Sequence, residues 1–336
     1  MGRIFLFGLA ILLAGAFITA PVLGSTLEDV RKRGELRCWV APSLPGYAFP
    51  DKKGNWSGFE VDFCRAVAAA VGVKVKFDPS SPRDRFNSLA LGSLDIMTHA
   101  TWTISRDTRL STDFVAVVFY DGQGFMVRKS LGVDSAKKLN NASVCVLTGT
   151  TTELNLADYF RSNGMKYRPV VFDNPIKALK AYDNNRCDVL TNDASGLAAR
   201  KGLLKNPDEN ILLPEIISKE PLGIVVRHGD NQWADIVRWV HNAMIIAEEK
   251  GITQANVERM ARTSKDPEVQ RMLGKTGSVG KDLGLSSDWA LNAIKAAGNY
   301  GENFARNLGK KSKIGLSRGL NRLWNKGGLI YAPPIR

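Results

Sequence analysis

The chain has 336 residues, of which 44% are hydrophobic and 24% are charged. This length and composition exclude a disordered chain and allow two ordinary domains. The formal net charge is +13, but residues 261–336 alone contain 14 Lys and Arg against 5 Asp and Glu. Most of the positive charge therefore lies near the C-terminus, and the preceding chain has no basic footprint for nucleic acid.

Residues 1–24 have the pattern of a secretory signal peptide. Arg3 precedes a long apolar run, and Val22 and Gly24 suit cleavage before Ser25. The alternative is an uncleaved membrane anchor, because residues 4–23 approach the length that spans a bilayer. We expect cleavage and export of a mature protein that begins at Ser25.

Four cysteines follow the leader: Cys38, Cys64, Cys145 and Cys187. An oxidising compartment and an even count favour disulfides. Three pairings are open, and Cys38–Cys64 with Cys145–Cys187 would keep each bridge within one half of the chain. Metal binding is the weaker alternative, because CxxC spacing is absent and the three histidines are scattered. We therefore expect no metal and no cofactor.

Strands and helices alternate between residues 36 and 120. Alternating order of this kind predicts a mostly parallel sheet with covering helices. Hydrophobic periodicity predicts strands at 36–41, 73–78, 95–98 and 114–120, and helices at 58–72, with Gly72 as C-cap, and at 84–94.

The same alternation starts again at residue 124. Residues 219–251 are then interpreted as a linker, a strand and a long amphipathic helix. This last unit could bring the chain back to the first lobe. The last 76 residues are rich in Gly and Lys, include helical pieces such as 289–308, and are interpreted as an appended extension. In the second half, strands are predicted at 124–129, 142–149, 168–173 and 187–193, and helices at 151–164 and 175–186.

The stretch from Thr98 to Arg109 follows the predicted strand 95–98 and is rich in hydroxyl groups. In open β/α sheets, ligands bind at the C-terminal ends of strands and at helix N-termini. Hydroxyl and N–H groups near Thr101 could bind a carboxylate, and Arg106 could bind one through two parallel hydrogen bonds. The alternative is a polar turn with a solvated arginine.

Two further strand ends lie in the second half of the chain. Thr150 and Glu153 have the spacing of a capping box, which would present helix N–H donors to a ligand or simply cap the helix. Asp193 ends a strand and could hold an ammonium group or cap the next helix. Arg106 in one lobe and Asp193 in the other would together clamp a zwitterion such as an α-amino acid.

Several segments resemble periplasmic amino-acid-binding proteins that serve ABC transporters. The family resemblance rests on GNWSGFEVDFCRAVAAAVG, LTGTTTE and DVLTND, and the closer likeness to general L-amino acid binding proteins on HATWTISRDTR, YDGQGFMVR and SKEPLGIVVRHGDNQW. The resemblance runs from about Leu27 to the C-terminus. It implies an α/β fold of periplasmic-binding-protein type II, a Venus flytrap whose two β/α lobes are joined by two crossover strands near 120–124 and 219–223. We expect lobe 1 at 25–121 and 222–258, lobe 2 at 122–221, and a basic helical extension at 259–336.

The resemblance also implies roles for individual residues. Thr101 and Arg106 would bind the α-carboxylate of the ligand, and Asp193 its α-ammonium group. Arg85 matches an arginine that binds acidic side chains in glutamate- and aspartate-binding relatives. The other expected cleft residues are Thr98, His99, Thr148 and Thr150. Ala41 and Leu44 stand where many narrow-specificity relatives have an acidic or aromatic residue. His99 stands where general amino-acid relatives often have Asn and other members Gly, and these departures leave the preferred side chain open.

These roles predict a receptor without catalytic residues. It would capture L-amino acids, polar or acidic and with some breadth, as a periplasmic monomer, and would deliver them to an inner-membrane ABC transporter permease. The alternative is a dehydratase-like enzyme on the same fold, with His99 or a cleft Glu as acid/base group. GxSxG, HExxH and P-loop motifs are absent. Nucleic-acid binding by the basic tail is the least favoured hypothesis.

Overall fold

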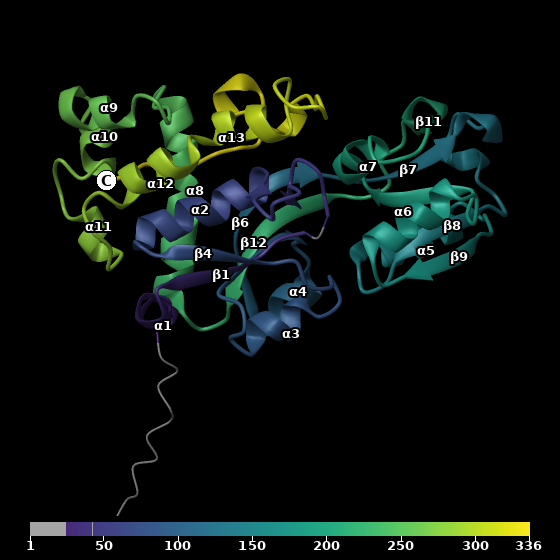
Figure 1. The fold of residues 1–336 in the computed structure, drawn as a ribbon, viewed down its shortest axis with the longest axis horizontal. Helices are drawn as coiled ribbons and strands as arrows, with labels where there is room; N and C mark the ends of the chain where they lie inside the picture. The colour runs from purple at the N-terminus through teal and green to yellow at the C-terminus, as the bar shows by residue number, and fades with distance from the viewer. Residues whose placement is uncertain (1–24, 42) are drawn as a thin grey trace, which may run out of the picture.

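Two β-sheets lie side by side, each covered by helices, in the computed structural model of the chain (Figure 1). The structure describes residues 25–41 and 43–336, and the predicted signal peptide at 1–24 lies outside the described residues. The chain crosses from the first sheet to the second at Gly122 and returns between residues 213 and 219. This is the predicted type II architecture of two lobes and two crossover segments.

The sheet of lobe 1 has the strand order β4-β1-β5-β12-β6. Strands β4, β1 and β5 are parallel, but β12 is antiparallel to both of its neighbours. The predicted mostly parallel sheet is therefore mixed, because β12 returns from the other lobe and inserts between β5 and β6. The strands are β1 (Glu35–Trp39), β4 (Lys74–Asp78), β5 (Ile96–Thr101), β6 (Thr112–Asp121) and β12 (Glu220–Arg227).

Helices cover lobe 1 on both faces. The longest, α8, buries one apolar side in its first half, as the amphipathic pattern of its sequence predicts, but residues 240–247 are buried on every side. Helix α2 ends at Gly72, whose φ of 84° is the left-handed conformation expected of a glycine C-cap. The helices are α1 (Thr26–Arg33), α2 (Phe59–Val71), α3 (Arg85–Ala90), α4 (Ile104–Arg109) and α8 (Asn231–Glu249), with a small hairpin of β2 (Phe49–Pro50) and β3 (Trp56–Ser57) beside them.

The sheet of lobe 2 has the strand order β11-β7-β10-β8-β9. Strand β10 is parallel to β8 and antiparallel to β7, so this sheet is also mixed. Its strands are β7 (Gln123–Arg128), β8 (Ser143–Leu147), β9 (Arg168–Phe172), β10 (Val189–Asp193) and β11 (Asn210–Leu212), and its α-helices are α5 (Thr151–Ser162), α6 (Pro175–Asp183) and α7 (Ala194–Lys201).

One disulfide in each lobe joins neighbouring parts of that lobe. Cys38 on β1 is bonded to Cys64 on α2, and Cys145 on β8 to Cys187, just before β10. The pairing that keeps each bridge within one half of the chain is therefore confirmed.

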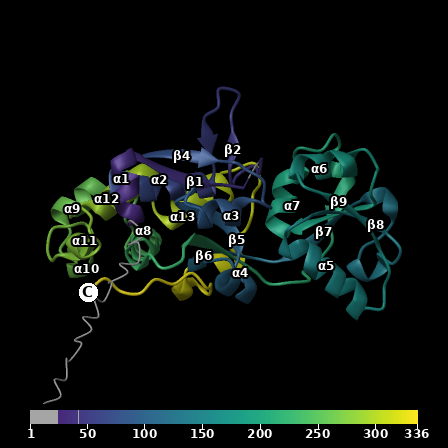
Figure 2. The same ribbon diagram turned by 90° about the horizontal axis from the view of Figure 1, so that it is seen from below.

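The C-terminal extension packs against lobe 1 and shares its core. Figure 2 shows helices α12 and α13 beside α2, and Trp289 and Ile294 belong to the same buried cluster as the lobe 1 strands. The predicted helical piece 289–308 is two helices, because Gly298 (φ 78°) ends the first and Asn299 caps the second. The helices are α9 (Val257–Thr263), α10 (Pro267–Met272), α11 (Val279–Asp282), α12 (Trp289–Ala297) and α13 (Tyr300–Asn307).

Beyond α13 the chain runs back along the edge of lobe 1. There the side-chain amide of Asn321 accepts a hydrogen bond from the Tyr120 N–H (2.7 Å) and donates one to the Tyr120 carbonyl (3.0 Å). Tyr120 lies on the edge strand β6, two residues before the crossover at Gly122. Across the described residues, no helix is both long and apolar enough to cross a membrane.

Candidate functional site

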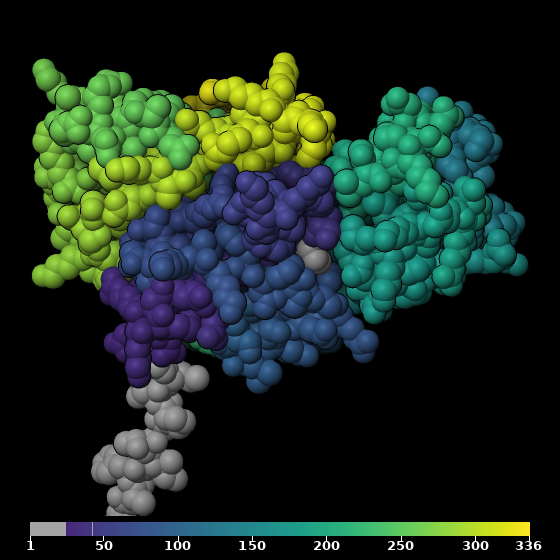
Figure 3. Space-filling model, in the orientation of Figure 1, coloured from purple at the N-terminus to yellow at the C-terminus, as the bar shows by residue number. Residues whose placement is uncertain are grey.

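A cleft between the two lobes gathers most of the residues predicted to bind ligand. The lobes touch along one side of this cleft in the space-filling view (Figure 3). Its predicted lining residues are Arg85, His99, Thr101 and Arg106 from lobe 1 and Thr150 and Asp193 from lobe 2. Trp39, Ala41, Leu44, Pro82, Leu147, Thr151, Thr152, Pro175, Asn192 and Arg200 complete the lining.

Arg106 is held at the edge of the cleft by a short helix. The stretch predicted as a turn is helix α4, and its N-cap Thr103 accepts a hydrogen bond from the Arg106 N–H (3.3 Å). The Arg106 guanidinium donates to the Thr101 carbonyl (3.0 Å) and lies 5.1 Å from the centre of the Phe86 ring. Burial lowers the pKa of Arg106. The nearby carboxylates of Glu220 and Asp193 act in the opposite direction, because they favour the charged guanidinium.

Glu220, behind the cleft residues Thr101 and Thr151, links the two lobes. Its carboxylate accepts hydrogen bonds from Thr101 of lobe 1 (2.5 Å) and from Thr151 (3.0 Å) and Asn155 (2.7 Å) of lobe 2. Ser218 adds a fourth bond, at 2.7 Å. Burial and the charge of Asp193 raise the pKa of Glu220, and the Thr101, Ser218 and Thr151 hydroxyls act in the opposite direction. The Thr101 hydroxyl is therefore already engaged as the donor of a hydrogen bond to Glu220.

His99, on the same strand β5 as Thr101, also bridges the lobes. Its backbone is in the left-handed region, with a φ of 54°. One ring nitrogen, Nδ1, lies 2.6 Å from Glu60 of lobe 1, and the other, Nε2, lies 3.4 Å from Asp193 of lobe 2. Burial alone would lower the pKa of His99, but Glu60 and Asp193 raise it to about 9 overall. The imidazole is therefore a cation near neutral pH, held between two carboxylates.

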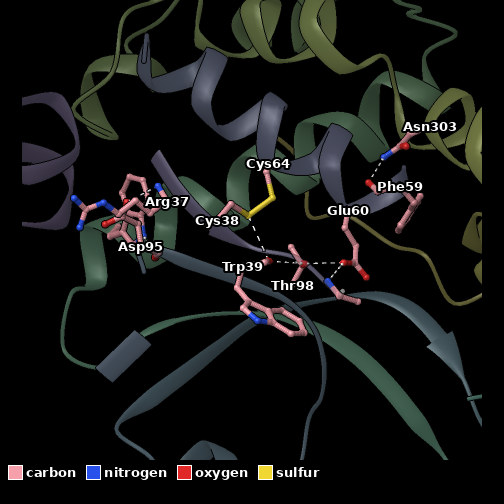
Figure 4. The surroundings of a disulfide bond; sticks show 11 residues. Arg37, Cys38, Trp39, Phe59, Glu60, Cys64, Asp95, Thr98 and Asn303 are labelled. Carbon is pink, nitrogen blue, oxygen red and sulfur yellow. Dashed lines mark hydrogen bonds between the residues drawn. A yellow bond between two sulfur atoms is a disulfide. The ribbon is translucent and has the colours of Figure 1, made fainter. Parts of the chain in front are cut away.

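Glu60 is positioned for this contact by groups behind the cleft wall. Its carboxylate accepts hydrogen bonds from the Ala41 N–H (2.9 Å) and the Thr98 hydroxyl (3.1 Å), and Thr98 also donates to the Trp39 carbonyl (3.0 Å) (Figure 4). Thr98 was predicted to line the cleft. The structure buries Thr98 at 1% exposure behind the lining, where it orients Glu60 and hence His99.

The loop before α5 caps that helix in a different way from the one predicted. The Thr150 hydroxyl accepts from the Glu153 N–H (3.4 Å), as a capping box requires. The Glu153 carboxylate, however, accepts from the Gly149 N–H (3.1 Å) and not from Thr150, so the reciprocal half of the box is wrong. Thr148 does not line the cleft, and its N–H is bonded to the Phe172 carbonyl (2.9 Å).

Two more arginines face the cleft, one from each lobe. The Arg85 guanidinium lies 4.6 Å from the centre of the Trp39 ring and donates to the His99 carbonyl (3.2 Å). Arg200, in the last turn of α7, donates to the Asn192 side-chain oxygen (3.0 Å). Burial lowers the pKa of Arg85 to about 9, with a contribution from Arg106, and that of Arg200 to about 10, so both remain charged at neutral pH.

Sequence reasoning missed Arg200, because a cation in the last turn of a helix usually interacts with the helix dipole. The spacing between Asp193 and Arg200 could have indicated that Arg200 faces the cleft. Arg200 follows Asp193 by seven residues, and this separation returns to the same helix face. Asp193 itself occupies the N-cap position of α7 but forms no side-chain cap hydrogen bond, which leaves its carboxylate to His99 and the cleft.

A third contact between the lobes lies next to the first crossover. Tyr47 of lobe 1 donates to the Ser195 hydroxyl of lobe 2 (2.6 Å), and Ser195 donates to the Asp121 carboxylate at the end of β6. Burial and the charge of Asp193 raise the pKa of Asp121 to about 7. The sequence analysis singled out none of these three residues.

Comparison with known proteins identifies the family. The family model described as bacterial extracellular solute-binding proteins, family 3, matches residues 36–310. The chain is 54% identical over 335 residues to the general L-amino acid-binding periplasmic protein of Rhizobium johnstonii, which covers 98% of this chain and 97% of that protein. It is 53% identical over 325 residues to the glutamate/glutamine/aspartate/asparagine-binding protein of Rhodobacter capsulatus, with 96% of each chain covered.

A solved structure has the same fold over nearly its whole length. It is an ABC transporter periplasmic binding protein from Brucella ovis with glutathione bound, similar at a TM-score of 0.90 and 52% identity over 93% of this chain and 99% of that chain. These named relatives are all described as binding proteins. The chain belongs to the bacterial extracellular solute-binding proteins of family 3.

Proposed function

We propose that the chain is a periplasmic receptor that captures L-amino acids, acidic ones included, between its two lobes. It would act as a monomer, after removal of residues 1–24, and deliver its ligand to an inner-membrane ABC transporter permease. The named relatives from Rhizobium johnstonii and Rhodobacter capsulatus support this ligand class. The proposal keeps the predicted lobe boundaries, with lobe 1 at 25–121 and 222–258, lobe 2 at 122–221, and the extension at 259–336.

Different cleft residues would bind different groups of the ligand. Arg106 would bind the α-carboxylate, with Thr101 beside it, and Asp193 would bind the α-ammonium group. The ammonium group would then take the place of the His99 imidazole near Asp193, leaving His99 with Glu60. Arg85 would bind a side-chain carboxylate, as in glutamate or aspartate. Glutathione, the ligand of the Brucella ovis protein, presents the same α-amino and α-carboxylate groups through its γ-linked glutamate.

One observation carries this proposal. The buried guanidinium of Arg106 from lobe 1 and the carboxylate of Asp193 from lobe 2, which caps no helix N–H group, line the same cleft. Opposite charges on two movable walls are complementary to the two ends of a zwitterion, and closing the lobes would strengthen both charge-assisted bonds.

The first prediction tests the α-carboxylate site. Arg106→Ala should weaken binding of every L-amino acid ligand by at least about tenfold, since a hydrogen bond to a charged group contributes about 1.5–3 kcal/mol. Calorimetric titration of the mature protein with a panel of twenty amino acids measures this. The matched control is Arg109→Ala, which removes an exposed arginine from the same helix. Ligand affinity retained in Arg106→Ala would refute the assignment.

A further inference from the structure

The last part of the extension, residues 309–336, carries only positively charged side chains. It contains seven Lys and Arg and no Asp or Glu. Arg318 pairs with Glu248 (2.6 Å), and no other of the seven forms an ion pair within the part of the chain that the structure describes. The remaining cationic side chains are all exposed: Lys310, Lys311, Lys313, Arg322, Lys326 and Arg336. This surface therefore has positive charge that the protein itself does not neutralise.

Large apolar side chains of the same segment are exposed as well. Four of them are between 50% and 60% exposed: Leu320, Trp324, Leu329 and Tyr331. The Leu329 N–H donates to the Leu320 carbonyl (2.8 Å), and the Trp324 and Tyr331 rings meet edge to face at 5.7 Å. We call residues 320–331 the C-terminal patch. Single exposed apolar residues are ordinary, but several that lie close together mark an interaction site.

The C-terminal patch is held in place from beneath by buried neighbours. Leu323 and Ile330 are each 1% exposed and belong to the core of lobe 1. The Trp324 N–H donates to the Ile330 carbonyl (2.9 Å), and the Trp324 indole N–H donates to Glu249 (2.9 Å) at the end of α8. A folded loop, and not a frayed end, therefore presents these apolar side chains to the surroundings. The end of the ribbon, yellow in Figure 2, runs along the outside of lobe 1.

The chemistry of the C-terminal patch fits the surface of a lipid bilayer. Trp and Tyr favour the membrane–water interface, and apolar side chains enter the boundary between headgroups and acyl chains. Exposed Arg322 and Lys326 lie in the same loop, and anionic headgroups attract such cations. The core of a protein–protein interface is depleted in Lys. Unpaired cations interspersed with Leu and Trp therefore favour lipid over a protein partner.

We infer that the C-terminal patch binds the surface of bilayers that contain anionic phospholipids. Trp324 and the leucines would enter the headgroup region, and Arg322 and Lys326 would contact lipid phosphates. The protein would lie on the membrane without spanning it. Because the patch belongs to the extension and not to the cleft, this inference goes beyond the proposed function and does not depend on which ligand the cleft holds.

The experiment measures co-sedimentation of the mature, full-length protein with two kinds of vesicle, phosphatidylcholine alone and phosphatidylcholine mixed with phosphatidylglycerol. The wild type should bind the anionic vesicles at least about tenfold more tightly, and added salt should weaken this binding. Trp324→Ser combined with Leu329→Ser should lower the affinity by about tenfold or more, because apolar area no longer leaves water. Arg322→Gln combined with Lys326→Gln should have a similar effect.

Two control variants carry matched changes outside the extension. Leu91→Ser with Leu154→Ser removes two exposed leucines, and Lys52→Gln with Lys53→Gln removes two exposed lysines. Both should bind anionic vesicles as the wild type does. Thermal unfolding of each variant checks that it folds.

Three results would overturn the inference. The first is equal binding of the wild type to both kinds of vesicle, a comparison that needs no variant. The second is full binding by the folded Trp324→Ser, Leu329→Ser protein, which would reduce the effect to general attraction between opposite charges. The third is binding to native inner-membrane vesicles but not to protein-free vesicles of the lipids extracted from them, which would assign the patch to a protein partner.

Discussion

At the scale of single residues, charged side chains from different elements pair with one another in the cleft. Glu60 comes from the first turn of α2, His99 from β5 and Asp193 from the end of β10. Together they form a carboxylate–imidazole–carboxylate line from lobe 1 to lobe 2. Because the middle group titrates near physiological pH when unperturbed, its charge is the most easily changed of the three.

The His99 charge should make stability depend on pH. The folded pKa of about 9 lies above the ordinary 6.5, so the stabilisation is complete below about pH 6.5 and is lost as the pH rises through about 9. Relative to His99→Asn, the wild-type free energy of unfolding should fall by on the order of 1–3 kcal/mol over this range. Urea unfolding of both proteins at several pH values measures the difference.

Other titrating groups near His99 make the paired measurement necessary. Glu60 and Asp193 face the imidazole directly, Tyr47 packs edge-on against it, and Asp121 lies close enough to interact with it. Asp121, with a pKa raised to about 7, reduces the stability of both proteins as the pH rises toward 7. Parallel stability curves for wild type and His99→Asn would contradict the assigned charge.

At the scale of elements, each lobe has one disulfide, which joins β1 to α2 in lobe 1 and β8 to the segment just before β10 in lobe 2. The Cys38–Cys64 bridge spans 26 residues and the Cys145–Cys187 bridge spans 42. Cross-links stabilise mainly by restricting the unfolded chain, and the effect grows slowly with the length of the closed loop.

Replacing either pair by serine should lower the free energy of unfolding by roughly 2–4 kcal/mol, with the Cys145–Cys187 pair costing slightly more. Thermal unfolding of the two double-serine variants measures this. A reductant should destabilise the wild type but leave a variant that lacks all four cysteines unchanged. Unaltered unfolding after either replacement would show that the bridge contributes nothing to stability.

Most of the order of helices and strands could be predicted from hydrophobic periodicity and from glycines at helix ends, because both depend only on residues close together in the sequence. Gly72 ended α2 as expected, and the extension was recognised as helical. The direction of β12 could not be predicted, since strand pairing depends on where the second crossover returns. The break at Gly298 was missed because a glycine inside an apolar periodic run can be tolerated or can end a helix. The family resemblance placed Thr98 in the cleft but could not show that its hydroxyl lies behind the lining residues.

At the scale of the whole molecule, the extension uses part of its positive charge to attach to lobe 1. Arg306 of α13 pairs with Asp62 of α2 (2.7 Å), and Arg318 pairs with Glu248 of α8 (2.6 Å). Arg318 also lies over the ring of Tyr300. These contacts give the basic tail a structural role that requires no nucleic acid.

Arg306→Ala should therefore destabilise the protein by about 1–3 kcal/mol, because the largely buried Asp62 loses a charged partner. Arg262→Ala removes the same charge from an exposed position of the extension and should change stability by less than about 0.5 kcal/mol. Denaturant unfolding of the two variants separates attachment from net charge. Equal effects would indicate that only the overall charge of the extension matters.

The hydrogen bonds from Asn321 to Tyr120 have a consequence for association between molecules. Strand β6 is at the edge of its sheet, and an edge strand presents N–H and C=O groups that can pair with a strand of another chain. The Asn321 amide satisfies both groups of Tyr120 without supplying a strand that continues the ladder. The extension thus protects the edge of β6 next to the crossover from pairing with a strand of another molecule. Without Asn321, movement of a lobe would leave this part of the edge accessible.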